Sequence, residues 1–348
     1  MRKPELLSII VFFLFSSCKT NLHFDTIIRS GIIYDGSGKK SFKGDVGINA
    51  DTIAFIGDLS NAKATNDIDA KGMAVSPGFI DVQSQSMESL IQDGRSLGAI
   101  KQGVTLEVFG EGESMGPLTD TMKKTEEKQE HDIKYKIEWT SLKDYLEYLQ
   151  KKGVSTNVAS FVGAATIREN VLLFDDRAPD SSELNKMKLL TKQAMEDGAL
   201  GIGSALIYAP GNYAKTDEII ALCKVASSYD GVYISHIRSE GNQLLQGADE
   251  LIKISKEANI PVMFYHLKAA GNPNWYKMDL LIAKIDSAKK AGLEISACMY
   301  PYTAGATGFD ASMPPSVQSG GLDKWVERLK DPATRKKILK EMVTPTND

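Results

Sequence analysis

The stretch GVYISHIRSEGNQLLQGADELIKISKEANIPVMFYHLKAA, residues 231–270, decides the fold. It contains two short runs of apolar, β-branched and aromatic residues, and each run ends in a histidine, His236 or His266. Between these runs, apolar residues recur at helical spacing over 242–259, which predicts an amphipathic helix. Two strands joined by one helix form a parallel βαβ unit, so we expect both histidines at the same edge of one sheet.

Two imidazoles at one edge of a parallel sheet suit a divalent transition metal such as zinc. The chain has four histidines, and two of them stand at matching strand ends. The alternative is that His236 and His266 each cap a strand and hydrogen-bond a neighbour. The matched positions favour the metal site over that alternative.

The alternation of strands and helices continues over residues 78–348 and predicts an α/β fold. The expected strands are 79–82, 104–109, 157–162, 200–206, 232–236, 262–266 and 294–300. Two further helices are expected at 181–196 and 322–342. Seven strand-helix units predict a TIM-like (β/α) barrel that is incomplete, with about seven strands. The polar segment 113–136 is expected to be a long loop over the barrel mouth.

The residues before this pattern have a different character. Residues 22–77 contain short strands and turns, which predict a small N-terminal β-domain. Residues 1–18 have a basic start, an apolar run too short to span a bilayer as a mature helix, and small residues before Cys18. This segment resembles a bacterial lipoprotein signal peptide, so we expect export, lipidation of Cys18 and anchoring to the periplasmic or cell-surface side of a membrane. The alternative is an ordinary signal peptide or an uncleaved anchor.

Charge and cysteine content exclude several classes of protein. The net charge is -4 and the pI is about 5.7, and the Lys/Arg pairs lie on predicted helices, so the sequence argues against a nucleic-acid partner. The three cysteines are far apart and form neither a disulfide framework nor a CxxC metal site.

Several blocks of sequence resemble one family, the N-acyl-D-amino-acid deacylases (D-aminoacylases) of the amidohydrolase superfamily. The blocks are PGFIDV (77–82), NVASFVG (157–163), ALIYAPG (205–211), ISHIRSE (234–240), YHLKAAG (265–271) and YPYTAG (300–305). The resemblance implies a hydrolase of linear amides that uses zinc and takes small-molecule N-acyl-D-amino acids as substrates. It also implies a metal-dependent amidohydrolase barrel over residues 78–348.

The resemblance further implies roles for individual residues. His236 and His266 match the family's zinc-binding histidines on the fifth and sixth strands. Tyr208 and Lys268 match residues that bind the carboxylate of the acyl-amino acid, a task that suits a phenol and an ammonium group. Arg238 is a third candidate for substrate binding, and its orientation is left open.

This chain departs from the family at two ligand positions. The superfamily's first-strand His-x-His is replaced by glutamines at 83 and 85, and an amide is a poor zinc ligand, so we expect one ion. The family's cysteine ligand falls in 110–113, where Glu111 or Glu113 offers a carboxylate. We expect Glu111 to be the ligand, which gives a site of two histidines and one glutamate, a known catalytic kind.

The family's catalytic aspartate follows an eighth strand, and this sequence stops at Asp348 before that strand. The catalytic residue is therefore unknown, and we expect the chain to be a fragment or the product of a truncated reading frame. Asp310, in a loop after the seventh strand, is a weak substitute. Two other functions compete with the deacylase: a cyclic amidase of the same superfamily, and a non-catalytic, lipid-anchored relative.

Overall fold

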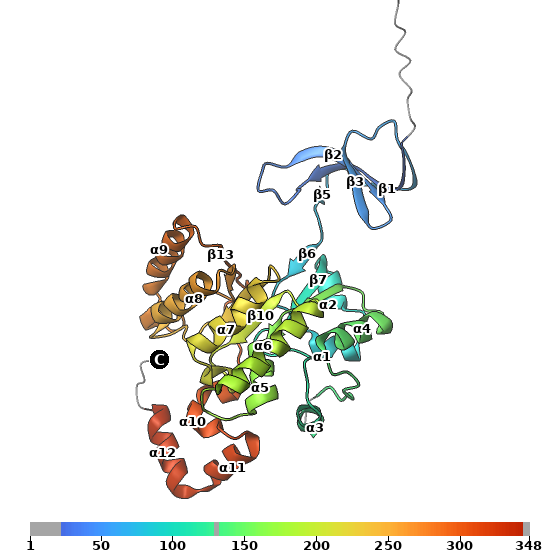
Figure 1. The fold of residues 1–348 in the computed structure, drawn as a ribbon. Coiled ribbons are helices and arrows are strands. Elements are labelled where there is room, and N and C mark those ends of the chain that lie inside the picture. The colour runs from blue at the N-terminus through green and yellow to red at the C-terminus, as the bar shows by residue number, and fades with distance from the viewer. Residues whose placement is uncertain (1–21, 129–131, 344–348) are drawn as a thin grey trace, which may run out of the picture. The chain divides into compact units, whose positions relative to one another are not determined.

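The computed structural model describes residues 22–128 and 132–343 (Figure 1). The chain divides into two compact units, Met1–Gly78 and Phe79–Asp348. Cys18, the residue expected to carry lipid, lies outside the described residues. In the described part, none of the helices combines the length and the apolar character that crossing a bilayer requires.

The first unit is a five-stranded β-sheet. Its strands are β1 (His23–Ile33), β2 (Phe42–Asn49), β3 (Thr52–Gly57), β4 (Lys63–Asp69) and β5 (Ala74–Val75), in the order β3-β2-β1-β4 with β5 also paired to β1. Strand β2 is antiparallel to β1 and β3, whereas β4 and β5 run parallel to β1. Phe24, Ile27 and Leu59 form the buried core. A Cβ atom on Gly47 would lie 2.6 Å from the Phe24 ring, so this packing requires glycine there.

The second unit is an α/β structure in which neighbouring strands run parallel. Its strands are β6 (Phe79–Asp81), β7 (Val104–Phe109), β8 (Asn157–Ser160), β9 (Val162–Gly163), β10 (Gly201–Ala205), β11 (Val232–His236), β12 (Val262–Phe264) and β13 (Ile295–Ala297). They form two sheets, ordered β6-β7-β8 and β9-β10-β11-β12-β13. The strands expected at 104–109 and 232–236 have the same bounds in the structure, whereas the one expected at 157–162 is interrupted at Phe161 and divided between the sheets.

The two sheets follow one another along the chain, and their outer strands meet at the carboxyl ends. The Tyr265 hydroxyl, beyond β12, donates a 2.6 Å hydrogen bond to the carbonyl of Val82, beyond β6. The Cys298 thiol, beyond β13, donates a 3.4 Å hydrogen bond to Gln83 Oε1. These contacts join the first strand of the unit to the last two, although the described strand pairs do not include β6 with β13.

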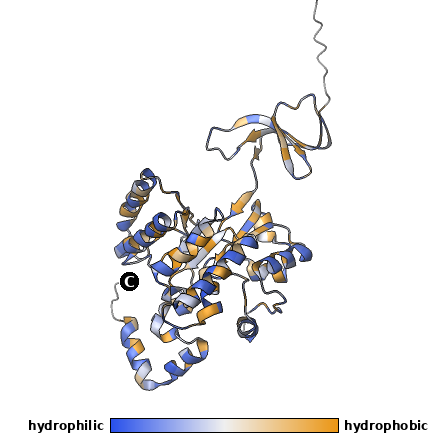
Figure 2. Ribbon diagram, viewed as in Figure 1, coloured by the Kyte–Doolittle hydropathy of each residue, from blue (hydrophilic) through white to orange (hydrophobic). Residues whose placement is uncertain are grey.

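Most of the helices between the strands place apolar residues in the core of the second unit (Figure 2). In α8 (Leu244–Ala258), the residues Leu244, Ala248 and Leu251 are fully buried at helical spacing, as the sequence predicts. The helices are α1 (Met87–Gln92), α2 (Leu97–Ile100), α3 (Asp120–Lys128), α4 (Leu142–Lys152), α5 (Ala164–Leu172), α6 (Ser181–Glu196), α7 (Thr216–Ser227), α8 (Leu244–Ala258), α9 (Lys277–Lys290), α10 (Pro315–Gln318), α11 (Leu322–Lys330) and α12 (Pro332–Val343), with short 3₁₀ turns η1 (Gly211–Tyr213), η2 (Asn272–Asn274) and η3 (Phe309–Ser312).

Two predictions about helices are wrong. The single helix expected over 322–342 is divided into α11 and α12, because Asp331 is extended (φ -75°, ψ 117°). The ring of Pro332 crowds the residue before it and disfavours a helical backbone there. The segment 113–136, expected to be a loop, contains α3, in which Met122 is the buried residue.

Candidate metal centre

Three side chains with metal-ligating atoms converge at the carboxyl ends of β7, β11 and β12. Glu111 follows β7 by two residues, His236 ends β11, and His266 follows β12 by two residues. Their ligating atoms all lie within 4.8 Å of one another. Glu111 Oε1 is 2.9 Å from His266 Nε2 and 3.5 Å from His236 Nδ1, and the two imidazole centroids are 4.4 Å apart. The histidines therefore lie side by side, as expected for neighbouring parallel strands.

Two glutamines hold the other oxygen of Glu111. The side-chain amides of Gln83 and Gln85 each donate a 2.8 Å hydrogen bond to Glu111 Oε2. Ser84, between them, donates a 3.0 Å hydrogen bond to the buried Glu107. Gln83 and Gln85 lie on either side of Ser84 in the segment that follows β6, and both of their amides are beside the centre. Glu111 Oε2 is thus occupied, while Oε1 faces the imidazoles.

A ring of hydrogen bonds links the backbone of His266 to Glu111. The His266 N–H donates to Cys298 Sγ at 3.3 Å, the Cys298 thiol donates to Gln83 Oε1, and Gln83 donates to Glu111. His266 has a φ of +35°, a left-handed conformation that costs a non-glycine residue about 1–3 kcal/mol. The ring stabilises this backbone conformation, which turns the imidazole toward Glu111.

A second carboxylate, Glu240, lies on the other side of both imidazoles. Glu240 Oε1 is 2.9 Å from His266 Nδ1, and Glu240 Oε2 is 3.7 Å from His236 Nε2. Lys268 Nζ donates a 2.6 Å hydrogen bond to Glu240 Oε1 and lies 2.8 Å from His266 Nδ1. His236 Nε2 is buried and has no hydrogen-bond partner in the described structure. Each imidazole therefore has a carboxylate on both sides.

These contacts shift the pKa values of the acids and of His266 in opposite directions. Burial raises the pKa of Glu111, but hydrogen bonds from His236 and His266 outweigh it and hold this pKa well below its usual range. Burial also raises the pKa of Glu240, but the hydrogen bond from His266 and the neighbouring positive charges lower it. Burial lowers the pKa of His266, whereas its hydrogen bonds to Glu111 and Glu240 raise it to about 9. Without a metal, the centre therefore holds two ionised carboxylates around a cationic imidazole.

Tyr208 and Lys268, the residues expected to bind a substrate carboxylate, lie beside the centre. The Tyr208 ring meets the His236 ring edge-on, with centroids 5.7 Å apart, and its hydroxyl is hydrogen-bonded to Thr307. The Lys268 ammonium is bound to Glu240, as described above. Both side chains are thus placed next to the imidazoles by the structure.

Arg238 and Glu113 are not brought to the centre. The Arg238 guanidinium donates to both carboxylate oxygens of Glu250, at 2.9 and 3.0 Å, and to two backbone carbonyls. Its donors are thus used to attach the loop after β11 to α8 and to the η1 segment. Glu113 is exposed and does not belong to the group of ligating atoms, and Asp310 lies in the short turn η3.

Two features of the centre are not predicted from the sequence: the position of Glu240 beside both imidazoles, and the clamp, which is the pair of amides of Gln83 and Gln85 that bind Glu111. Glu240 stands in the same ISHIRSE block as His236, four residues later, in the loop that follows β11. A carboxylate at the end of a strand that carries a metal-ligating histidine was a usable signal. The sequence indicates that Gln83 and Gln85 are poor zinc ligands, but their side-chain amides are also hydrogen-bond donors, and it is in this role that they bind Glu111.

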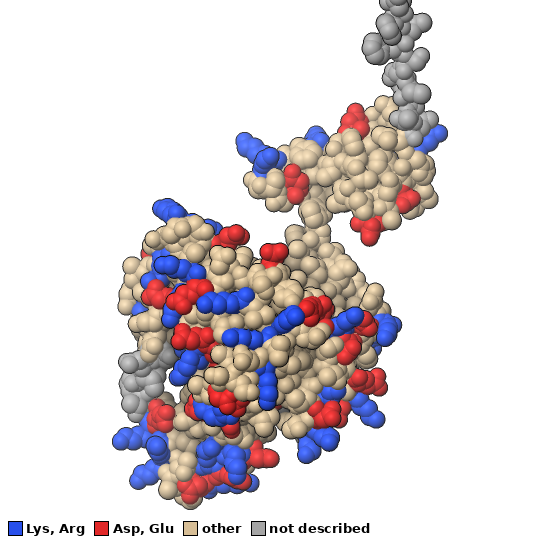
Figure 3. All heavy atoms as spheres, viewed as in Figure 1, with Lys and Arg blue, Asp and Glu red and all other residues tan. Residues whose placement is uncertain are grey.

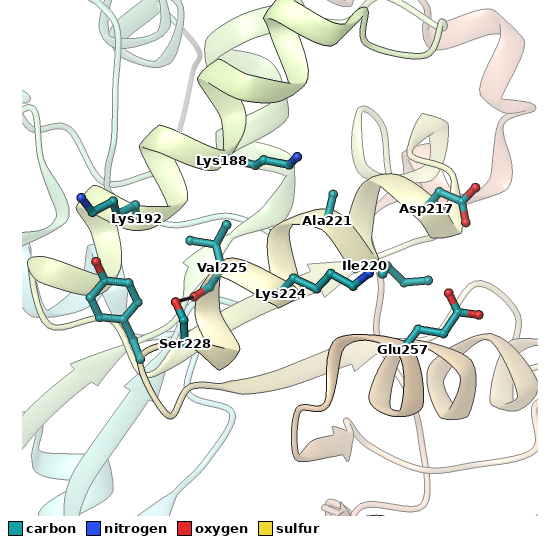
Figure 4. Close-up of a pocket in the computed structure, with 10 residues that line it drawn as sticks. Lys188, Lys192, Asp217, Ile220, Ala221, Lys224, Val225, Ser228 and Glu257 are labelled. Carbon is teal, nitrogen blue, oxygen red and sulfur yellow. Dashed lines mark hydrogen bonds between the residues drawn. The ribbon is translucent and has the colours of Figure 1, made fainter.

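The pocket shown in Figure 4 lies away from these side chains. It measures about 670 Å³ and lies between α6, α7 and α8, where Lys188, Lys224 and Glu257 are among the lining residues. None of the metal-centre residues lines it. Figure 3 shows acidic and basic side chains mixed over the visible face of the second unit. The converging titratable groups are therefore at the strand ends and not in this pocket.

The donor set at the strand ends fits zinc. Two imidazole nitrogens and one carboxylate oxygen, with a further position for water or substrate, form a known kind of catalytic zinc site. His236 and His266 are 7% and 8% exposed, and the three ligating atoms already converge. Glu111 has one oxygen available for an ion, because the other accepts two amide hydrogens.

Comparison with known proteins identifies relatives of this chain. No family model matches it. It is 34% identical over 286 residues to D-aminoacylase of Alcaligenes xylosoxydans xylosoxydans, covering 82% of this chain and 58% of that protein. A crystal structure of D-aminoacylase, described as defining a novel subset of amidohydrolases, has a TM-score of 0.74 and 33% identity over 81% of this chain and 59% of that one. N-acyl-D-glutamate deacylase from Bordetella bronchiseptica, complexed with zinc and a phosphonate inhibitor, has a TM-score of 0.73 and 28% identity over 80% of this chain and 59% of that one.

These relatives agree with the family expected from the sequence blocks, and that prediction is confirmed. The chain spans 58% of the length of the curated D-aminoacylase that it matches. Within that span, the chain is similar in sequence and in fold to the D-aminoacylases, a subset of the amidohydrolases.

Proposed function

We propose that this protein is a zinc-dependent hydrolase that cleaves the amide bond of N-acyl-D-amino acids. The observation that carries the proposal is the convergence of Glu111, His236 and His266 at neighbouring strand ends. The relatives named D-aminoacylase and N-acyl-D-glutamate deacylase support this substrate class. The structure of N-acyl-D-glutamate deacylase from Bordetella bronchiseptica, with zinc and a phosphonate that mimics the tetrahedral intermediate, supports the metal and the reaction type.

The proposed site holds one zinc ion. A binuclear metal centre has been described for D-aminoacylase, in which one metal activates and the second attenuates. In this chain the amides of Gln83 and Gln85 stand beside Glu111 and occupy its Oε2. Amides are poor zinc ligands, and their donated hydrogens leave Glu111 one oxygen for a metal.

Each side chain at the centre has a proposed task. His236, His266 and Glu111 would hold the ion, which supplies Lewis-acid polarisation of the amide carbonyl and a lowered pKa for water. Tyr208 and Lys268 lie beside the imidazoles, where a phenol and an ammonium group are suited to orient the substrate carboxylate. A carboxylate held there would place its acyl amide toward the imidazoles.

The second unit is proposed to be an incomplete TIM-like barrel. Its strands occur in chain order with parallel neighbours, which is the arrangement of a (β/α) barrel. The hydrogen bonds from Tyr265 to Val82 and from Cys298 to Gln83 support curvature that brings the outer strands toward one another. A ligand site at the carboxyl ends of the strands is also what this architecture favours.

The N-terminal segment is proposed to anchor the exported protein to a bacterial membrane through lipid on Cys18. The support is the pattern of residues 1–18, with its basic start, short apolar run and small residues before the cysteine. Expression with a labelled fatty acid should label the wild-type chain, recovered with membranes, and should leave Cys18→Ser unlabelled. Equal labelling of both chains would exclude Cys18 as the attachment site.

The decisive test of the enzyme combines metal analysis with assays on N-acyl-D-amino acids, N-acyl-L-amino acids and cyclic amides. Bound zinc with D-selective release of the free amino acid supports the proposal, and turnover of the cyclic amide alone supports the cyclic amidase. Zinc-free, inactive protein supports the non-catalytic relative. A His236→Ala variant that kept full zinc content would remove the metal assignment.

A further inference from the structure

We propose that Glu240 is a positioning residue that sets the tautomer of both imidazoles at once. This inference rests on the proposed zinc site. Each oxygen of the Glu240 carboxylate faces a different imidazole, Oε1 at 2.9 Å from His266 Nδ1 and Oε2 at 3.7 Å from His236 Nε2. One carboxylate thus serves the two histidines that come from different strands.

The position of each ring proton depends on which nitrogen of the ring faces which acid. His236 Nδ1 and His266 Nε2 face Glu111 Oε1, so these inner nitrogens would bind an ion together with that oxygen. An imidazole nitrogen that binds a metal carries no proton, so the proton of each neutral ring must be on its outer nitrogen. Those outer nitrogens are the two that face Glu240. Lys268 Nζ also lies 2.8 Å from His266 Nδ1, so the ammonium group and the His266 N–H share Glu240 Oε1 as their acceptor. A carboxylate that accepts the outer N–H fixes the ring orientation and raises the basicity of the inner nitrogen. Glu240 lies at hydrogen-bond distance from His266 Nδ1, whereas at 3.7 Å it acts through its charge on His236 Nε2, which has no hydrogen-bond partner in the described structure.

Glu240 is itself held in place by the segment that carries His266. Its side chain is 12% exposed, and its Oε1 accepts the 2.6 Å hydrogen bond from Lys268 Nζ. Its backbone carbonyl accepts a 2.8 Å hydrogen bond from the N–H of Ala270. Side chain and backbone are therefore both attached to the loop after β12, although Glu240 itself lies in the loop after β11. This attachment couples the two histidine-bearing loops.

The chain offers a matched control for substitution of Glu240. Glu250 is also 12% exposed and also pairs with a basic side chain, Arg238, but its hydrogen bonds go to Arg238 and Thr216 and not to an imidazole. Glu240→Gln and Glu250→Gln remove one negative charge each from similar surroundings. A general loss of stability would affect both variants, whereas a positioning role affects only the first.

The experiment measures Zn²⁺ affinity by competition with a chelator and records ¹⁵N spectra of the full-length chain labelled at its histidines. The chain has four histidines, so their ring signals can be assigned by single substitutions. In the Zn²⁺-loaded wild type, we expect His236 to carry its proton on Nε2 and His266 on Nδ1. Glu240→Gln should bind Zn²⁺ about 10- to 100-fold more weakly and lose or shift both N–H signals, while Glu250→Gln keeps both.

Two results would overturn the inference and leave the zinc site standing. One is a Zn²⁺-loaded wild type with its ring protons on the opposite nitrogens, and this measurement needs no variant to fold. The other is unchanged Zn²⁺ affinity and unchanged N–H signals in Glu240→Gln. A wild type that binds no Zn²⁺ would instead overturn the proposed function and this inference together.

Discussion

The metal-free protein should lose stability at alkaline pH through His266. This imidazole is 8% exposed and hydrogen-bonded to Glu111, and Glu240 lies on its other side, which together raise its pKa from 6.5 to about 9. The difference is about 2.5 pH units (9 minus 6.5), and at about 1.4 kcal/mol for each unit it corresponds to about 3 kcal/mol. Because the folded state binds this proton more tightly, the contribution is fully present below pH 6.5 and is lost as the pH rises through about 9.

Urea unfolding in the presence of a chelator, followed by tryptophan fluorescence, measures this loss. All three tryptophans, Trp139, Trp275 and Trp325, belong to the second unit, so the signal reports that unit. Between about pH 6 and about pH 10, the free energy of unfolding of the wild type should fall by about 3 kcal/mol more than that of His266→Gln. His23→Gln, in the first unit, serves as the control and should behave as the wild type does.

An equal loss of unfolding free energy by His266→Gln and the wild type over this pH range would show that His266 does not hold the stabilising proton. Added Zn²⁺ should also abolish the part of the pH-dependent change in unfolding free energy that is due to His266, because the ion takes the place of the proton. If this change in unfolding free energy persists with saturating Zn²⁺, the proton is not at the metal-binding nitrogen.

Three further substitutions test the buried polar groups. Glu111→Gln should weaken Zn²⁺ binding by more than about 100-fold in chelator competition, since it removes a ligand charge, while the exposed Glu113→Gln should not change it. Glu107→Leu should lower the free energy of unfolding in urea by about 2–4 kcal/mol, because it removes the acceptor of three hydroxyl groups. Arg168→Met should lower the free energy of unfolding by about 3–5 kcal/mol in the same assay, because Arg168 is 0% exposed and its loss leaves Glu218 buried without its cation. Thermal unfolding should rank the wild type and these two variants in the same order of stability.

The strand pattern could be predicted because it is written locally in the chain. The runs at 104–109 and 232–236 are rich in β-branched and apolar residues and each begins directly after a glycine, and the structure has strands with those bounds. The division of the helix before Pro332 was not predicted, although the sequence contains the signal for it, because a proline disfavours a helical backbone at the residue that precedes it. The polar helix α3 could not be predicted, since it buries Met122 and shows no apolar periodicity.

The convergence of His236 and His266 could be predicted because a βαβ unit fixes which strand ends are neighbours. The clamp on Glu111 could not. It joins Gln83 to a residue 28 positions later and Cys298 to a residue 215 positions earlier. Such contacts depend on how far the outer strands curve toward each other, and residue periodicity carries no information on that curvature.

The charges around the centre explain why it suits a divalent cation. Glu111 and Glu240 contribute two negative charges, Lys268 contributes one positive charge, and the amides of the clamp contribute none, which leaves a net charge of -1 (two negative, one positive). A proton on His266 restores neutrality in the metal-free protein, which is why its pKa is raised. A divalent ion that replaces this proton changes the net charge to +1, so the loaded centre favours an anionic ligand. An N-acyl-amino acid carries such an anion in its free carboxylate, and the same charge balance that holds the proton therefore favours both the metal and the proposed substrate class.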